Sequence, residues 1–231
     1  RLPRRAQSPG YLPLPGYTGQ HEWQGYVPFE ELPSIYNPPS GRIVTANQNP
    51  FPPGFADAGA GHFSDPHRAN QILARIDSKP KWKAAGMLEI QKDVYSPYYA
   101  FLARQVVSAA DRKKPTAGMV ADAVEVLRNW NGQAELDATG ASIARLYSIG
   151  LRAAILKRLA PKWEKAEIGM DDAVVERILR TRDPLYAKDY DAWLLEVLGN
   201  VLEENRSRLG GTLANWKYRE LMKWNVDQPV F

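Results

Sequence analysis

The side chains best suited to chemistry in this sequence gather between residues 37 and 68. The run Thr45-Ala46-Asn47-Gln48-Asn49-Pro50 follows a β-branched segment, residues 42–46, that predicts a strand. A side-chain amide can donate a hydrogen bond to a developing oxyanion without a proton-transfer step, so Asn47 is a candidate oxyanion donor. The alternative is that Asn47 and Asn49 only bond to the backbone of a turn, and the residue types alone favour that alternative.

Arg68 is a second candidate because of where it lies in a predicted helix. The run Ser64-Asp65-Pro66 predicts a helix start, with a Ser or Asp cap and a proline in the first turn. A cation in the first turn opposes the helix dipole, which suggests that Arg68 has a partner such as a carboxylate. An ordinary surface or structural role fits the residue type equally well.

Other reactive side chains carry weaker signals. Asp57 lies in a loop rich in Pro, Gly and Ala, where a lone Asp usually supports a turn, and a calcium site needs about six oxygens. The histidines, at positions 21, 62 and 67, share no metal-ligand spacing. Ser148 lies within a predicted helix without the glycines of a nucleophile elbow. The sequence has no cysteine, which excludes a thiol nucleophile and a disulfide framework.

Motifs in the N-terminal part carry a family resemblance. They are W-x-G-x-x-P-F-E at Trp23–Glu30, N-P-x-x-G-x-I at Asn37–Ile43 and T-A-N at Thr45–Asn47. Together they resemble the β-subunit of the penicillin acylase family of N-terminal-nucleophile amidohydrolases, which includes penicillin, cephalosporin and acyl-homoserine-lactone acylases. Leu88–Ser96 is similar to the family's L-x-x-Q-x-D-x-x-S helix, and Leu127–Gly132 to its L-x-x-W-D-G turn with Asn for Asp.

The resemblance implies roles for particular residues. The position of Asn47 is that of an asparagine that forms the oxyanion hole with a backbone N–H from elsewhere. Arg68 matches an arginine beside the catalytic centre that helps to fix the nucleophile and the oxyanion region. Asp57 falls near a calcium-ligating carboxylate of the family. The family often reads T-A-N-N, and this sequence departs from that pattern by having Gln48 in place of the second Asn.

The resemblance also implies what lies outside this chain. The family's nucleophile is a Ser at the start of the β-subunit, with its own α-amine as base. We therefore expect the partners to be the α-subunit, the β-subunit part that bears this Ser, and a small-molecule amide substrate. Calcium is possible in the full protein, and none is expected for this chain alone, which we expect to be inactive. A zymogen, periplasmic or secreted placement, and links to antibiotic resistance or quorum quenching also follow only from the resemblance.

Composition sets broad bounds. The 231 residues are 44% hydrophobic and 24% charged with a net charge of +4, as in an ordinary globular protein. Without a Lys/Arg run or a basic stripe, nucleic-acid binding is disfavoured. No apolar run reaches membrane-spanning length. The sequence begins with Arg1 and has no initiator Met, so we interpret it as an excised piece or a processed subunit.

The element pattern predicts a mainly α fold, as a partial piece of an αββα N-terminal-nucleophile hydrolase. Residues 1–63 read as an irregular, short-stranded arm with Trp23 and Tyr26 as buried anchors. Residues 64–222 read as helical, and residues 223–231 as the start of a strand of the missing catalytic sheet. The helices are predicted by capping and periodicity, over 82–91, 97–111, 116–127, 139–159, 171–180, 190–209 and 212–222.

These observations leave two functions of different class. In one, the chain is part of a penicillin-acylase-like hydrolase and completes a site built by other segments, which predicts exposed apolar patches. In the other, it is a non-catalytic helical interaction module with a polar surface. The linked motifs between Trp23 and Arg68 favour the first.

Overall fold

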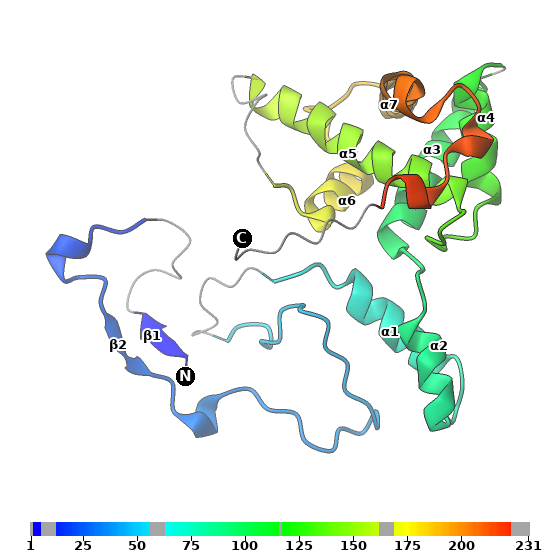
Figure 1. Ribbon diagram of the computed structural model, residues 1–231. Helices are drawn as coiled ribbons and strands as arrows, with labels where there is room; N and C mark the ends of the chain where they lie inside the picture. Colours follow the sequence, from blue (N-terminus) through cyan, green and yellow to red (C-terminus); the bar gives the residue numbers. More distant parts are fainter. Residues whose placement is uncertain (1, 6–12, 56–62, 116, 162–168, 223–231) are drawn as a thin grey trace, which may run out of the picture. The chain divides into compact units, whose positions relative to one another are not determined.

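A computed structural model describes residues 2–5, 13–55, 63–115, 117–161 and 169–222 (Figure 1). The chain divides into two compact units, the N-terminal unit of residues 1–79 and the helical unit of residues 80–231. The predicted mainly α fold with a short-stranded arm is confirmed. The predicted strand at residues 223–231 lies outside the described residues.

The N-terminal unit contains a small antiparallel sheet and a helix. Strand β1 (Pro3–Arg5) pairs with β2 (Trp23–Tyr26), in the register Pro3 to Tyr26 and Arg5 to Trp23. Single 3₁₀ turns form at Gly16–Thr18 and Phe29–Glu31. Helix α1 (His67–Asp77) ends the described part of this unit and belongs to it rather than to the helical unit.

Three expectations for the N-terminal unit were wrong. Trp23 and Tyr26 are 59% and 46% exposed rather than buried, because the described arm has only a two-stranded ribbon and no layer to cover them. Residues 42–46 do not form a strand, since no strand among the described residues pairs with them. Helix α1 begins at His67 without the predicted Ser or Asp side-chain cap.

The helical unit is built from longer helices around one apolar core (Figure 1). Its elements are η3 (Ala84–Gly86), α2 (Met87–Gln91), α3 (Pro97–Lys113), α4 (Met119–Asn129), α5 (Thr139–Leu159), α6 (Asp172–Thr181), α7 (Tyr190–Leu209), η5 (Leu213–Asn215) and η6 (Tyr218–Glu220). The predicted helix over 82–91 is shorter than expected, and the one over 212–222 is replaced by the two 3₁₀ turns.

Local signals explain where the main helices begin and end. Ser96 accepts a hydrogen bond from the N–H of Tyr99 at 3.3 Å and so caps α3, whose first residue is Pro97. Asp189 caps α7 in the same way, with the N–H of Ala192 at 3.0 Å. Gly210 ends α7 in a conformation with φ of 88°, which costs glycine little.

Close helix packing in this unit depends on small residues. Helices α3, α5 and α7 enclose fully buried side chains that include Leu102, Tyr147 and Leu198. A Cβ placed on Gly150 of α5 would lie 2.2 Å from Val201 Cγ2 of α7. Glycine at position 150 therefore allows these two helices to approach closely.

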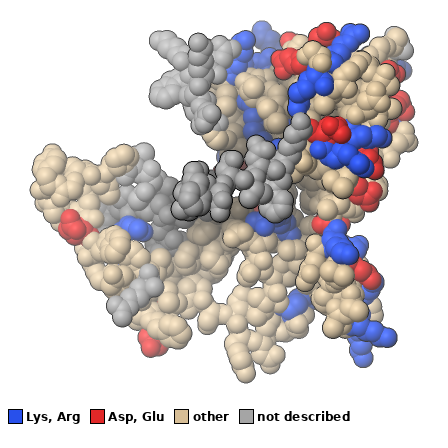
Figure 2. Space-filling model, viewed as in Figure 1, with Lys and Arg blue, Asp and Glu red and all other residues tan. Residues whose placement is uncertain are grey.

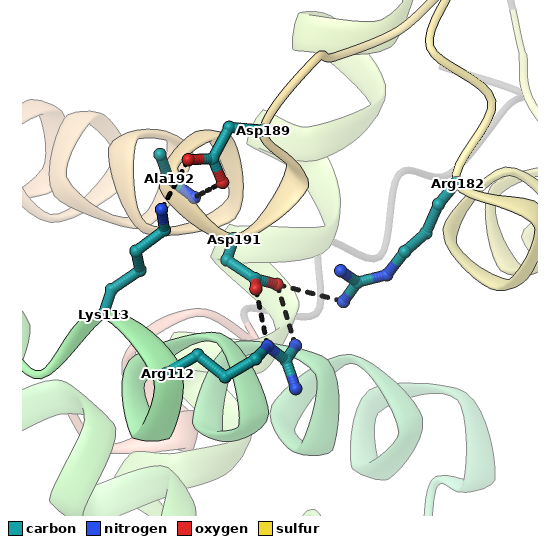
Figure 3. Close-up of polar contacts among 6 residues, drawn as sticks. All are labelled: Arg112, Lys113, Arg182, Asp189, Asp191 and Ala192. Atoms are coloured by element: carbon teal, nitrogen blue, oxygen red, sulfur yellow. Dashed lines mark hydrogen bonds and ion pairs between the residues drawn. The ribbon is translucent and has the colours of Figure 1, made fainter.

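Ion pairs join the ends of three helices (Figure 3). The carboxylate of Asp191 on α7 accepts hydrogen bonds from Arg112 on α3, at 2.5 and 2.8 Å, and pairs with Arg182 after α6 at 3.0 Å. Only 12% of the Asp191 side chain is exposed. Hydrogen bonding to Arg112, followed by that to Arg182, lowers the pKa of Asp191 to about 2. This carboxylate therefore stays ionised and ties the helix ends together.

Candidate active site

The candidate site lies in the N-terminal unit, where a bent stretch of backbone presents Asn47. Asn47 has a φ of 64°, the left-handed conformation that asparagine adopts more readily than most residues. Its carbonyl accepts a hydrogen bond from the N–H of Ser64 at 2.7 Å. Ser64 thus fixes the Asn47 backbone rather than capping α1, and the Asn47 side chain remains exposed.

Arg68, in the first turn of α1, determines how the Asn47 amide is oriented. Its Nη2 donates to Asn47 Oδ1 at 2.8 Å and to the carbonyl of Ala46 at 2.9 Å. A guanidinium can only donate hydrogen bonds, so the oxygen of the amide must face it. The Nδ2 donor of Asn47 then points away from Arg68, and among the described residues it has no acceptor.

The structure therefore brings together two of the predicted site residues. The partner of Arg68 is an amide oxygen and a backbone carbonyl, whereas the sequence suggested a carboxylate. Asn49 behaves as the turn alternative proposed, because its Oδ1 accepts from the N–H of Phe51 at 2.9 Å. Asn47 instead directs its side chain toward Arg68.

Gln48 is a part of the site that sequence reasoning passed over. Its Oε1 accepts from the N–H of Ala46 at 2.6 Å, and its Nε2 donates to the carbonyl of Val44 at 3.1 Å. These are the backbone groups that the predicted strand would have bonded to a neighbour. The departure from T-A-N-N at position 48 was the signal that could have directed attention to it.

Some predicted groups do not contribute to the described site. Asp57 and His62 lie outside the described residues. Within the described ranges, no three His, Cys, Asp or Glu side chains gather as a metal site requires. Ser148 lies inside α5 and is 1% exposed, which rules it out as a nucleophile for a substrate from solution.

Similarity to known proteins identifies the family of this chain. The sequence matches the family model described as penicillin amidase over residues 1–231. The chain belongs to the penicillin amidase family. Membership of the penicillin amidase family supports an amidohydrolase type of function.

Relatives in the penicillin amidase family are longer than this chain. It is 28% identical to the penicillin acylase 2 proenzyme of Pseudomonas sp. (strain SE83) over 222 residues, which cover 96% of this chain and 26% of that protein. It is 22% identical to the acyl-homoserine lactone acylase QuiP of Pseudomonas putida over an alignment of 258 residues, gaps included, which covers 100% of this chain and 32% of that protein. The chain thus spans about a quarter to a third of these relatives.

The fold of this chain is similar to that of a solved penicillin G acylase structure. The thermostable penicillin G acylase from Alcaligenes faecalis matches with a TM-score of 0.66 and 17% identity, over 93% of this chain and 45% of that chain. Among the described helices of the present chain, none is both long enough and apolar enough to cross a membrane.

Proposed function

We propose that this chain is the part of a penicillin-amidase-family hydrolase that supplies one donor of the oxyanion hole. The complete enzyme cleaves an acyl side chain from an amide. Asn47 Nδ2 donates to the oxyanion, and Arg68 holds the amide in the required orientation. The hydrogen bond from Arg68 to Asn47 Oδ1 carries this proposal, because it engages the acceptor end of the exposed amide and leaves the Nδ2 donor directed away from Arg68.

The chemistry that this arrangement supports is acyl transfer. A nucleophilic Ser of another segment attacks the amide carbonyl, and the carbonyl oxygen becomes negatively charged in the tetrahedral intermediate. A preoriented amide N–H stabilises this charge without reorganising at the moment of reaction. A second donor, a backbone N–H, comes from elsewhere in the enzyme.

Exposed apolar side chains support assembly with other segments. On the described arm, Tyr17, Phe29 and Tyr36 are 93%, 83% and 95% exposed, and Ile35 is 67% exposed. Figure 2 shows that the irregular arm before α1 carries few charges on the visible face, whereas both signs are interspersed over the helical unit. Such apolar exposure favours an enzyme part that other segments cover over a free-standing interaction module.

The proposal extends to the substrate class, to calcium and to the cellular location of the complete enzyme. Relatives are named penicillin acylases and acyl-homoserine lactone acylases, so an acyl amide of penicillin, cephalosporin or acyl-homoserine-lactone type is the proposed substrate. Calcium in the complete enzyme, with Asp57 as a ligand, and periplasmic or secreted placement stay predictions.

The test is substitution of Asn47 in the full-length enzyme. Asn47→Ala removes the donor, and loss of one oxyanion-hole donor lowers kcat by about 10²–10³-fold. We expect KM for an acyl-amide substrate to change little, because the donor acts mainly in the transition state. Asn49→Ala, which removes only a turn bond, is the matched control. An Asn47→Ala enzyme with the kcat of the parent would contradict the proposal.

A further inference from the structure

Gln48 folds its side chain back onto the backbone that precedes Asn47. The amide oxygen takes the N–H two residues earlier, and the amide nitrogen reaches the carbonyl four residues earlier. Both ends of the Gln48 amide are used by the chain itself, and the side chain is half-buried. A side chain in this position is not available to substrate.

The backbone on both sides of Asn47 is therefore held by named groups. On the preceding side, Gln48 bonds the N–H of Ala46, and Arg68 bonds the carbonyl of the same residue. Ala46 itself is 8% exposed, so these polar groups lack easy access to water. On the following side, Ser64 bonds the Asn47 carbonyl at 2.7 Å. The contacts of Gln48 join residues within the segment 44–48, whereas Arg68 and Ser64 contact this segment from later in the chain.

We infer that Gln48 is a positioning residue for the oxyanion donor Asn47. This inference rests on the proposed function and adds to it the residue that fixes the backbone from which the donor projects. Asparagine tolerates the left-handed conformation of Asn47, and the contacts of its neighbours select this conformation over the extended alternatives. Loss of the Gln48 bonds releases residues 44–46 and moves the donor. A displacement of about 1 Å at a catalytic group can cost on the order of 10²-fold in rate.

The first part of the experiment separates positioning from general structure in the full-length enzyme. Gln48→Met keeps the length of the side chain and removes both hydrogen bonds. We expect kcat to fall about 10–100-fold with KM little changed, and peptides that cover residues 44–49 to exchange their amide hydrogens faster. Gln20→Met, at an exposed position in the same unit, is the matched control.

The second part uses rescue by pH. In Gln48→Glu, a protonated carboxyl can donate to the Val44 carbonyl and accept from the Ala46 N–H, as the amide does. The ionised carboxylate cannot donate and repels the carbonyl. The kcat of this variant, divided by that of the parent at each pH, should rise as pH falls through the pKa of the introduced carboxyl.

The outcomes separate this inference from the proposed function. In the double variant Gln48→Met with Asn47→Ala, Gln48→Met should add little to the loss, since there is no donor left to position. Fully multiplicative losses, or a parental kcat for Gln48→Met, would overturn the inference. Unchanged exchange at residues 44–49 would overturn the restraint itself. A parental kcat for Asn47→Ala would defeat the proposed function instead.

Discussion

At the residue scale, one contact decides what Asn47 can do. An exposed asparagine has a donor and an acceptor end, and in a turn its oxygen commonly accepts from the backbone, as that of Asn49 does. Here a donor-only guanidinium, 2.8 Å from Oδ1, assigns the two ends. The side chain becomes an oriented N–H donor rather than an adaptable amide.

Replacing Arg68 tests this assignment. Arg68→Met keeps much of the side-chain volume and removes the donor, so the Asn47 amide can rotate. We expect kcat of the full-length enzyme to fall about 10–100-fold, with a smaller loss for Arg68→Lys, which keeps the charge on a shorter side chain. Steady-state kinetics give the comparison, with Arg42→Lys as control, since Arg42 forms an exposed ion pair with Asp77. Equal activity of Arg68→Met and the parent would count against the assignment.

The residues of the site were predictable only in part. Motifs pointed to Asn47 and Arg68, and the structure places their side chains in contact. The contact between them joins positions 21 apart, and its geometry depends on how the loop returns to α1. Local patterns do not encode such a return, which is why the strand over 42–46 was wrongly predicted and the bonds of Gln48 were missed.

At the element scale, helix ends are fixed by a few polar groups. The predicted helix over 139–159 has the observed bounds of α5, and that over 190–209 those of α7, because a strong apolar pattern and the Gly210 stop act locally. The ion pairs of Asp191 in Figure 3 could not be predicted, since they join helix ends far apart in sequence.

The Asp191 pairs predict a pH dependence of stability. The folded-state pKa, about 2, lies below the ordinary value of about 4, so the carboxylate stabilises the fold above pH 4 and this contribution is lost as pH falls toward 2. Asp191→Asn should lower the free energy of unfolding by about 1.5–3 kcal/mol near neutral pH. The difference from the parent should shrink across pH 4 to 2 in urea titrations. A constant difference across that range would be the contrary result.

The close approach of Gly150 and Val201 predicts that adding even a methyl group at position 150 lowers the stability of the fold. Gly150→Ala places a Cβ 2.2 Å from Val201 Cγ2, and overpacking of this kind costs about 1–3 kcal/mol. We expect a lower Tm, restored in part by adding Val201→Ala. Gly199→Ala in α7 is the control, because its Cβ would meet Val120 at an ordinary 3.6 Å. A Tm for Gly150→Ala at or above that of the parent would show that α5 and α7 can move apart to accommodate the methyl group without loss of stability.

At the scale of the whole molecule, the chain matches only part of the length of its relatives. It spans 26% of one relative and 32% of another, and its arm exposes aromatic side chains. The family resemblance predicted the penicillin amidase family correctly. Composition alone could not have predicted the family, because hydrophobic and charged fractions of this size are common to most globular domains.

The purified chain alone should not hydrolyse an acyl amide. In the proposed function it supplies an oxyanion donor and its supports, and the nucleophile belongs to another segment. We expect no turnover of a chromogenic acyl amide by the chain, and turnover by the full-length enzyme assayed in parallel. Stoichiometric or greater product release by the chain, abolished by Asn47→Ala, would show that it contains a nucleophile of its own.

The supports of Asn47 are all close to it along the chain. The longest of them, from Arg68 to the carbonyl of Ala46, joins residues 22 positions apart, and every one belongs to the N-terminal unit. Closing a loop of this length costs little more entropy than closing one half as long. The groups that support Asn47 are therefore inherited together, in the one short, contiguous stretch of residues 44–68.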